Sequence, residues 1–260
     1  MPPPQVYRGS QKHVLVWTGQ PSFLDEFADL LAPCRVHFSA EAPFMPRGVA
    51  APTEARLETF GPSWLPGDQA WPQLKEWWLG HGRGGNTPNW DIAVGCEVAG
   101  SPGLALVEAK ANWPELGTGR KRLAADASAG SRENHERIGA AIAEACAGWK
   151  LVDDGVCISR DSHYQLANRL AFTWKLATLG IPVVLLYLGF TGDDGIRDAG
   201  RPFADDADWQ NAFTAYVPDA VPLTMFQRRL DVESTPVWLL SRSRPVIHVS
   251  PAVRTPPPDS

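Results

Sequence analysis

Residues 89–111, NWDIAVGCEVAGSPGLALVEAKA, decide the fold of this chain. Segments 90–98 and 103–111 are rich in apolar and β-branched residues, and the turn-forming residues AGSPG separate them. Two such segments around a short turn predict a β-hairpin. Because successive side chains of a strand point to opposite faces, Glu108 and Lys110 project together from the second strand.

The charged end of this hairpin predicts chemistry. Glu108 and Lys110 follow Leu104 and Leu106 on one face, where charge is costly unless it is paired or bound to an ion. Asp91 begins the first strand and therefore lies at the same end of the hairpin. Two carboxylates, a main-chain carbonyl and water suit Mg²⁺ or Mn²⁺, and a neighbouring lysine can orient or deprotonate an attacking water. The set predicts a site that hydrolyses phosphate esters.

A family resemblance follows from these residues. Residues 89–91 (NWD), the glycine-containing hairpin and residues 107–110 (VEAK) resemble the motif of the PD-(D/E)XK nuclease superfamily. The order of helix, hairpin, helix and strand over 69–112 and 162–190 also matches. The resemblance implies an α/β fold: a mixed central sheet flanked by helices, with a restriction-endonuclease-like core at about 69–190 and additional N- and C-terminal elements.

The resemblance also implies roles for the matching residues. Asp91, Glu108 and Lys110 would be catalytic. Asp91 and Glu108 would bind Mg²⁺ (or Mn²⁺), the carbonyl of Ala109 would add a ligand, and Lys110 would serve the nucleophilic water. The chain departs from the family pattern at Trp90, which replaces the usual proline before the aspartate.

Further site residues are implied on the two neighbouring helices. Many family members add an acidic metal ligand from the helix before the hairpin, and Glu76 is the first candidate, with Glu54 or Glu58 behind it. Members often add a polar residue from the helix after the motif. Gln165 and Arg169, one helical turn apart, could face the site or the phosphate backbone of a substrate.

Two basic segments outside the motif are candidates for substrate contacts. Arg83 lies in the glycine-rich loop 80–85, and Lys121 lies in the basic cluster 120–122. Both could contact phosphates, although a plain connector and a solvated surface are the alternatives. The loop matches GxGxxG formally, but it follows a predicted helix and precedes a strand. A dinucleotide-binding loop requires the opposite order.

The other segments predict a chain that alternates helices and strands. We expect strands at 13–18, 34–40, 183–190, 236–240 and 245–249, and helices after Ser22 and at 53–60, 69–79, 131–148, 162–179 and 206–215. The helix at 131–148 is an insertion between the motif and the second core helix. Residues 1–12 and the proline-rich residues 251–260 are expected to be tails of a single decorated domain, 13–250.

Composition narrows the class of protein. Of 260 residues 44% are hydrophobic and 20% are charged, which is typical of a folded soluble domain. With 24 Lys+Arg against 29 Asp+Glu the net charge is −5, so a nucleic acid would be bound by a local basic surface. The four cysteines form no CxxC pair, and no HExxH occurs, which disfavours a zinc site. The longest apolar run, 181–190, is shorter than the roughly 20 residues of a membrane helix.

The sequence therefore predicts a cytoplasmic, metal-dependent nuclease. DNA is the favoured substrate, no membrane partner is expected, and a homodimer or a partner protein could supply affinity. The alternative is a catalytically silent nuclease-like module that binds nucleic acid or acts in protein assembly. Intact Asp91, Glu108 and Lys110 favour the enzyme, because a purely structural module does not need this set.

Overall fold

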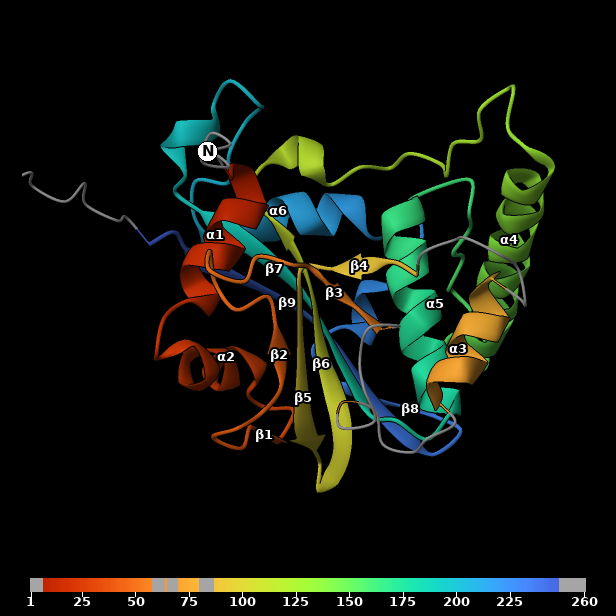
Figure 1. Cartoon of the computed structure of the whole chain (residues 1–260), viewed down its shortest axis with the longest axis horizontal. Helices are drawn as coiled ribbons and strands as arrows, with labels where there is room; N and C mark the ends of the chain where they lie inside the picture. The colour runs from red at the N-terminus through yellow and green to blue at the C-terminus, as the bar shows by residue number, and fades with distance from the viewer. Residues whose placement is uncertain (1–6, 58–63, 65–69, 80–86, 248–260) are drawn as a thin grey trace, which may run out of the picture.

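The computed structural model describes residues 7–57, 64, 70–79 and 87–247. These residues form an α/β protein around a mixed, curled seven-stranded sheet (Figure 1). The strands of this sheet are β1 (Val36–His37), β2 (Phe44–Met45), β5 (Ile92–Val98), β6 (Ser101–Lys110), β7 (Val183–Thr191), β8 (Arg229–Val232) and β9 (Thr235–Pro245). A separate two-stranded sheet pairs β3 (Ala55–Arg56) with β4 (Asn89–Trp90).

The predicted hairpin consists of β5 and β6, near the middle of the sheet. These strands pair antiparallel, from Ile92 opposite Val107 to Val98 opposite Ser101. Strand β6 then pairs parallel with β7, and β7 pairs parallel with β9, while β8 runs antiparallel to β9 at one edge. Strands β1 and β2 pair with β5 at the other edge. The prediction of a mixed central sheet is confirmed.

Strand β7 is the most deeply buried strand. Every residue of VVLLYLGFT is buried. A strand between two parallel neighbours has both faces covered and therefore carries apolar side chains in succession rather than in alternation. The prediction of a buried strand at 183–190 is confirmed.

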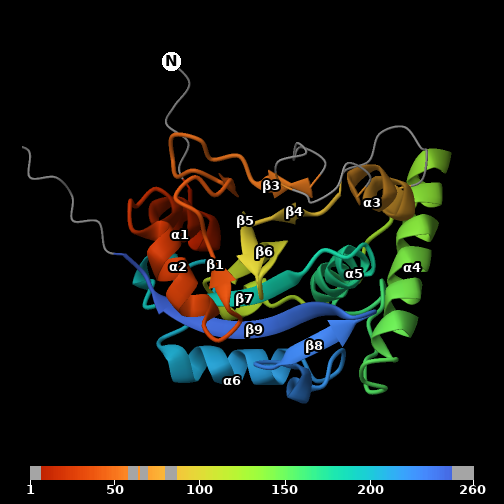
Figure 2. The same ribbon diagram turned by 90° about the horizontal axis from the view of Figure 1, so that it is seen from below.

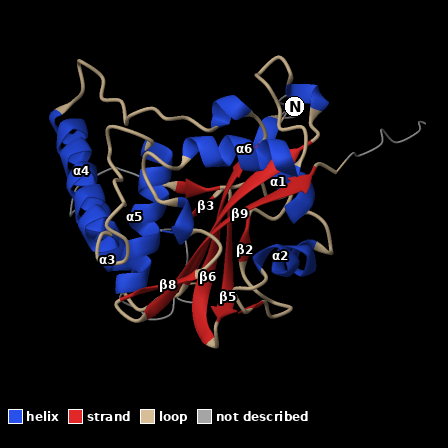
Figure 3. Cartoon of the chain, turned by 180° about the vertical axis from the view of Figure 1, so that it is seen from behind, coloured by secondary structure: helices blue, strands red, loops and turns tan. Residues whose placement is uncertain are grey.

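Helices cover both faces of the sheet. The described helices are α1 (Gly9–Thr18), α2 (Phe23–Leu31), α3 (Ala70–Leu79), α4 (Ala129–Trp149), α5 (Tyr164–Thr178) and α6 (Asp206–Tyr216). Short 3₁₀ helices lie at η2 (Trp113–Glu115), η3 (Asp194–Ile196) and η4 (Leu223–Met225). Helices α1 and α2 lie on one face, and α6 lies on the other (Figures 2 and 3). Helices α3, α4 and α5 pack together beside the sheet (Figure 1).

Strand alternation divides the core into two clusters. Leu104 and Leu106 of β6 join the cluster formed with α3 to α6. Ala105 and Val107 of the same strand join the cluster formed with α1 and α2. Glu108 and Lys110 continue the row of Leu104 and Leu106, as the alternation predicts. Their side chains therefore point toward α5.

Two glycines determine how closely helix α5 packs on α4 and where α5 ends. A Cβ at Gly148 of α4 would overlap the indole of Trp174, so the close approach of α4 and α5 requires glycine there. Gly180 has a φ of 77° and ends α5 in a Schellman motif, in which Ile181 N–H donates to Leu176 at 3.0 Å. The helices predicted at 131–148 and 162–179 are confirmed.

The N-terminal segment differs from its prediction. Residues 13–18 form part of helix α1, not a strand, and α1 begins at Gly9, within the predicted tail. His13, Val14 and Trp17 are buried and recur at a helical spacing. Their burial against the sheet outweighs the strand preference of the valines in this segment.

Other differences concern short elements. The helix predicted at 53–60 is wrong where the structure describes it, because residues 55–56 form β3; residues 58–60 lie outside the described residues. The strand predicted at 34–40 is confirmed only as β1. Strand β9 continues to Pro245, and the described part of the strand predicted at 245–249 forms no second strand.

The helices predicted at 69–79 and 206–215 are confirmed as α3 and α6. In the part of the chain that the structure describes, no helix is both long enough and apolar enough to cross a membrane.

Candidate active site

A cleft of about 550 Å³ opens at the charged end of strand β6. Asp91, Glu108, Ala109 and Lys110 line it from the hairpin, and Gln165 and Arg169 line it from α5. The remaining lining residues are Ser10, Glu54, Asn89, Pro114, Glu115, Gly117, Gly119, Arg120 and Tyr164. Residues from distant parts of the sequence therefore meet at the end of the hairpin, as predicted.

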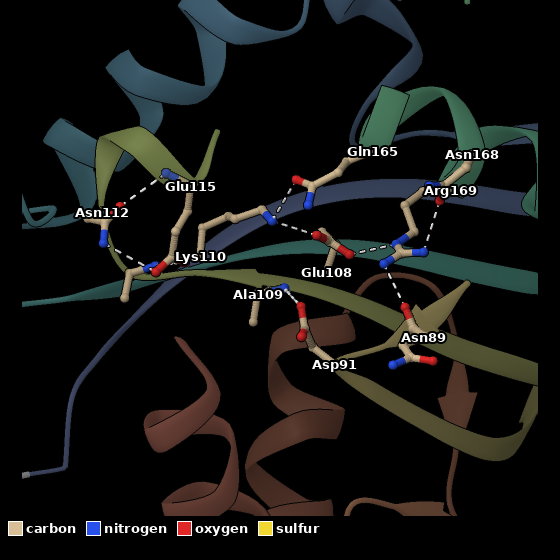
Figure 4. Close-up of polar contacts among 11 residues, drawn as sticks. Asn89, Asp91, Glu108, Ala109, Lys110, Asn112, Glu115, Gln165, Asn168 and Arg169 are labelled. Atoms are coloured by element: carbon tan, nitrogen blue, oxygen red, sulfur yellow. Dashed lines mark hydrogen bonds and ion pairs between the residues drawn. The ribbon is translucent and has the colours of Figure 1, made fainter. Parts of the chain in front are cut away.

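Glu108 and Lys110 form a buried ion pair in this cleft. Lys110 Nζ donates to Glu108 Oε1 at 2.5 Å and to Gln165 Oε1 at 3.1 Å (Figure 4). Glu108 is 2% exposed and Lys110 is 5% exposed. Lys110 is therefore held between Gln165 of α5 and Glu108 of its own strand, β6.

Asp91 lies at the bend between β4 and β5, where antiparallel pairing with β6 ends. Its Oδ2 accepts a hydrogen bond from Ala109 N–H at 2.7 Å (Figure 4). The N–H and C=O groups of one strand residue point to the same edge of the strand. The carbonyl of Ala109 is therefore directed to the edge where Asp91 lies, which is consistent with the predicted ligand pair.

Arg169 points at Glu108 rather than outward. Its Nε donates to Glu108 Oε2 at 2.5 Å, and a terminal nitrogen donates to the carbonyl of Asn89 at 2.6 Å (Figure 4). Its guanidinium also lies 4.5 Å from the ring centroid of Trp90. Arg169 is 7% exposed. It orients Glu108 and lines the cleft, so it faces the site, which is one of its two predicted positions; its contact with a substrate phosphate stays a prediction.

The charged groups of the cluster shift one another's pKa values. Burial would raise the pKa of Glu108, but Arg169 and Lys110 outweigh burial and lower it to about 2. Burial, followed by repulsion from Glu108, raises the pKa of Asp91 to about 7. Burial alone would lower the pKa of Lys110, yet Glu108 and Asp91 raise it. Lys110 is therefore a charged ammonium at neutral pH.

The third predicted acidic residue at the cleft is Glu54 and not Glu76, which was the first candidate. Glu76 lies on α3 and does not line the cleft, because α3 packs against α4 and α5 instead. Glu54, the second candidate, does line the cleft, and its Oε2 accepts from Asn89 Nδ2 at 2.6 Å. Arg56 Nε donates to Asn89 Oδ1 at 2.7 Å. Pairing of β3 with β4 brings Glu54 to the site, and Glu58 lies outside the described residues.

Of the two basic residues predicted to contact a substrate, the structure describes only Lys121. Arg83, with its loop 80–85, lies outside the described residues. Lys121 does not line the cleft at the end of β6. Its ammonium lies 4.8 Å from the ring centroid of Tyr164, which does line the cleft.

Asn112 and Glu115 hold the backbone beside the cleft, a role that was not expected from the sequence. Glu115 Oε2 accepts from Ala111 N–H at 2.9 Å, and Asn112 Oδ1 accepts from Glu115 N–H at 3.0 Å (Figure 4). Asn112 is thus the N-cap of η2, and Glu115 reaches one residue further back than in a capping box, to the N–H of Ala111. These hydrogen bonds fix the chain where it leaves β6 and enters η2.

The donor set fits a hard divalent cation. Mg²⁺ is usually held by one or two carboxylates and keeps several waters. Asp91, Glu108 and the Ala109 carbonyl are such a set. Among the described residues, no group of three or more His, Cys, Asp or Glu side chains could hold a metal by itself.

Comparison with known proteins identifies no relative of this chain. No model of a known protein family matches the chain, and no curated protein and no solved structure matches it either. The resemblance to the PD-(D/E)XK nucleases therefore rests on the motif residues of the sequence.

Proposed function

We propose that this chain is a metal-dependent nuclease that hydrolyses phosphodiester bonds, with DNA as the favoured substrate. The observation that carries the proposal is the meeting of Asp91, Glu108 and Lys110 in one cleft. These residues belong to the motif that resembles the PD-(D/E)XK superfamily, and a buried carboxylate pair beside a lysine suits phosphodiester hydrolysis.

The order of the sheet supports the same proposal. An antiparallel hairpin, β5 and β6, is followed through α5 by β7, which pairs parallel with β6. Helix α3 precedes the hairpin. This is the order of helix, hairpin, helix and strand that the restriction-endonuclease-like core implies, with α4 as the insertion.

Asp91, Glu108 and the carbonyl of Ala109 are the groups that would hold Mg²⁺ or Mn²⁺. When bound, such a cation lowers the pKa of a water and offsets the negative charge of a phosphate. Asp91 is suited to this role because burial and Glu108 disfavour its free carboxylate, so a cation that replaces the proton relieves the repulsion.

The other side chains have separate roles. Because the pKa of Lys110 is raised, the side chain acts as a donor that aligns a water or stabilises developing charge, and not as a base. Gln165 fixes the ammonium of Lys110. Arg169 is a positioning residue, since its guanidinium orients Glu108.

One observation favours the silent module as a second candidate. Lys110 and Arg169 already bind both oxygens of Glu108. Their two positive charges balance the negative charges of Glu108 and Asp91 without a metal ion. A divalent cation would have to replace at least one of these contacts of Glu108. A module that never exchanges these contacts would bind no metal at Glu108 and would be inactive.

Cleavage and metal binding separate the two candidates. We expect the purified chain to cleave supercoiled plasmid or labelled single strands with Mg²⁺ or Mn²⁺ and not with EDTA, and to bind Mn²⁺ in calorimetry. Glu108→Gln should abolish both, whereas Glu144→Gln on the surface of α4 should retain both. Absence of cleavage and of Mn²⁺ binding in the wild type would overturn the proposal and favour the silent module.

A further inference from the structure

A second cleft adjoins the catalytic cleft. It has a volume of about 620 Å³ and is lined by residues 119–123, by His135 of α4 and by Asp161. Gly119 and Arg120 line both clefts. The two clefts therefore share a wall, formed by the chain that runs from η2 to α4 (Figure 1).

The backbone of this shared wall is anchored beside α5. His163 N–H donates to Thr118 and Tyr164 N–H donates to Gly119, each at 3.0 Å. Lys121 N–H donates to the carbonyl of Arg160 at 2.9 Å. These three hydrogen bonds fix the backbone of residues 118–121 against the segment before α5. The basic side chains of this loop therefore project from a backbone of defined position.

The anchored loop has an excess of positive charge. Arg120 and Arg122 are exposed, and neither forms an ion pair within the residues that the structure describes. Asp161, the acidic side chain in the lining, accepts from Arg160 Nε at 3.3 Å. Its charge is thus partly balanced by a residue outside the cleft.

His135 is a second and independent observation in the same cleft. It is 8% exposed, and neither ring nitrogen has a hydrogen-bond partner in the described residues. A buried imidazole without partners is unfavourable unless a ligand supplies one. The basic residues around it select an anionic acceptor.

We infer that this second cleft is a phosphate subsite for the strand whose scissile phosphate lies in the catalytic cleft. His135 and Arg122 bind a backbone phosphate, and Arg120 lies between the two clefts. The inference rests on the proposed function, because continuity with the catalytic cleft identifies the anion as part of a polynucleotide. The substrate strand therefore extends from the active centre past the start of α5 toward α4.

Binding without cleavage tests the subsite. We would measure the affinity of a fluorescent single-stranded DNA oligonucleotide by anisotropy in EDTA, for the wild type, Arg122→Glu and Arg229→Glu. Arg229 lies on β8 and is paired with Asp231, so its reversal changes the net charge equally outside either cleft. We expect Arg122→Glu to weaken binding several-fold more than Arg229→Glu.

The salt dependence supplies a second readout. Each phosphate contact on a single strand contributes about 0.7 to the slope of log K against log salt concentration. Arg122→Glu should lower that slope by about one such contact, and Arg229→Glu should leave it unchanged. Equal affinities and equal slopes in the two variants would overturn the subsite.

His135 reports on the subsite directly. In protein with isotope-labelled histidine, with His135 assigned through His135→Gln, its ring signals should shift on addition of the oligonucleotide, and the shift should be smaller in Arg122→Glu. Unchanged His135 signals in the wild type would also overturn the inference. None of these measurements requires cleavage. A wild type that binds the oligonucleotide here but never cleaves strands would refute the proposed function and would leave the second cleft as a binding site for a backbone phosphate.

Discussion

Two buried clusters of ionisable side chains lie on opposite faces of the sheet, and they differ in their surroundings. On the face covered by α1, His13 Nε2 and Asp193 Oδ2 lie 2.5 Å apart, and both side chains are almost fully buried. On the other face, Glu108 is held by Lys110 and Arg169 at the bottom of an open cleft.

The comparison shows that burial of charge does not by itself indicate a site. His13 and Asp193 form a closed pair within the apolar cluster that includes Phe190. The cluster of Glu108 has a second carboxylate, Asp91, whose pKa is raised to about 7 by burial and by Glu108. A cleft and an unfavourable pair of carboxylates set the proposed reactive cluster apart from the His13–Asp193 pair.

The largest effect is expected from Lys110→Met. The change keeps the apolar stem and removes the ammonium that touches Glu108 and Gln165. Loss of one group that aligns or stabilises the reacting atoms lowers hydrolysis by about 10²–10⁴-fold. Cleavage rates under Mg²⁺ measure this, and Lys175→Met on α5 is the matched control that should cleave normally. Equal rates in both variants would remove Lys110 from the site.

Arg169→Met should cause the largest loss of stability in the comparison. Glu108 would keep only Lys110 as a partner, and removing one partner from a buried ion pair lowers the free energy of unfolding by about 3–5 kcal/mol. Urea unfolding measures the loss. Adding Glu108→Gln to the variant should recover part of it, because the amide is uncharged. A loss that the second change does not reduce would mean that packing on Trp90, and not charge, makes Arg169 important.

Asp193→Asn should separate the closed cluster from function. It replaces a charge-assisted hydrogen bond with a neutral one, which lowers the free energy of unfolding by about 1–3 kcal/mol. Cleavage should stay at the wild-type rate once the variant is folded. A variant that is as stable as the wild type but cleaves slowly would mean that the closed cluster serves the reaction.

The smallest effect concerns pH. Burial lowers the pKa of His13 below its usual 6.5, and His13 lowers the pKa of Asp193 below its usual 3.8 against the effect of burial. The unfolded chain therefore binds these protons at higher pH than the folded chain does. The stability from His13 is complete above pH 6.5 and is lost as the pH falls through its folded pKa, at no more than about 1.4 kcal/mol per pH unit.

Unfolding free energies between neutral pH and pH 5 measure this effect as the difference between the wild type and His13→Gln. We expect the difference to shrink as the pH falls. A difference that grows on acidification would show that His13 is charged in the folded protein.

The hairpin and the faces of β6 could be predicted from the sequence because they depend on local patterns. Alternation over residues 103–111 is enough to place Glu108 and Lys110 together, and Asp91 follows from antiparallel pairing. The same reasoning does not identify α1. Valines favour strands locally, and only burial against the sheet shows that a helix forms there.

The third acidic residue and the role of Arg169 depend on distant contacts. Glu54 reaches the cleft because β3 pairs with β4, and this pairing joins segments that no short pattern links. Arg169 lies one turn from Gln165, as expected, but its direction depends on the carbonyl of Asn89 and on the ring of Trp90. Contacts between segments that lie far apart in the sequence cannot be predicted from a local sequence pattern.

The most direct test compares two isosteric changes of buried carboxylates on opposite faces, Asp91→Asn and Asp193→Asn, in the nicking of supercoiled plasmid with Mg²⁺ and with EDTA. We predict metal-dependent nicking by the wild type and by Asp193→Asn, and none by Asp91→Asn. Nicking by Asp91→Asn at the wild-type rate, or a wild type that nicks no DNA with metal, would contradict this prediction.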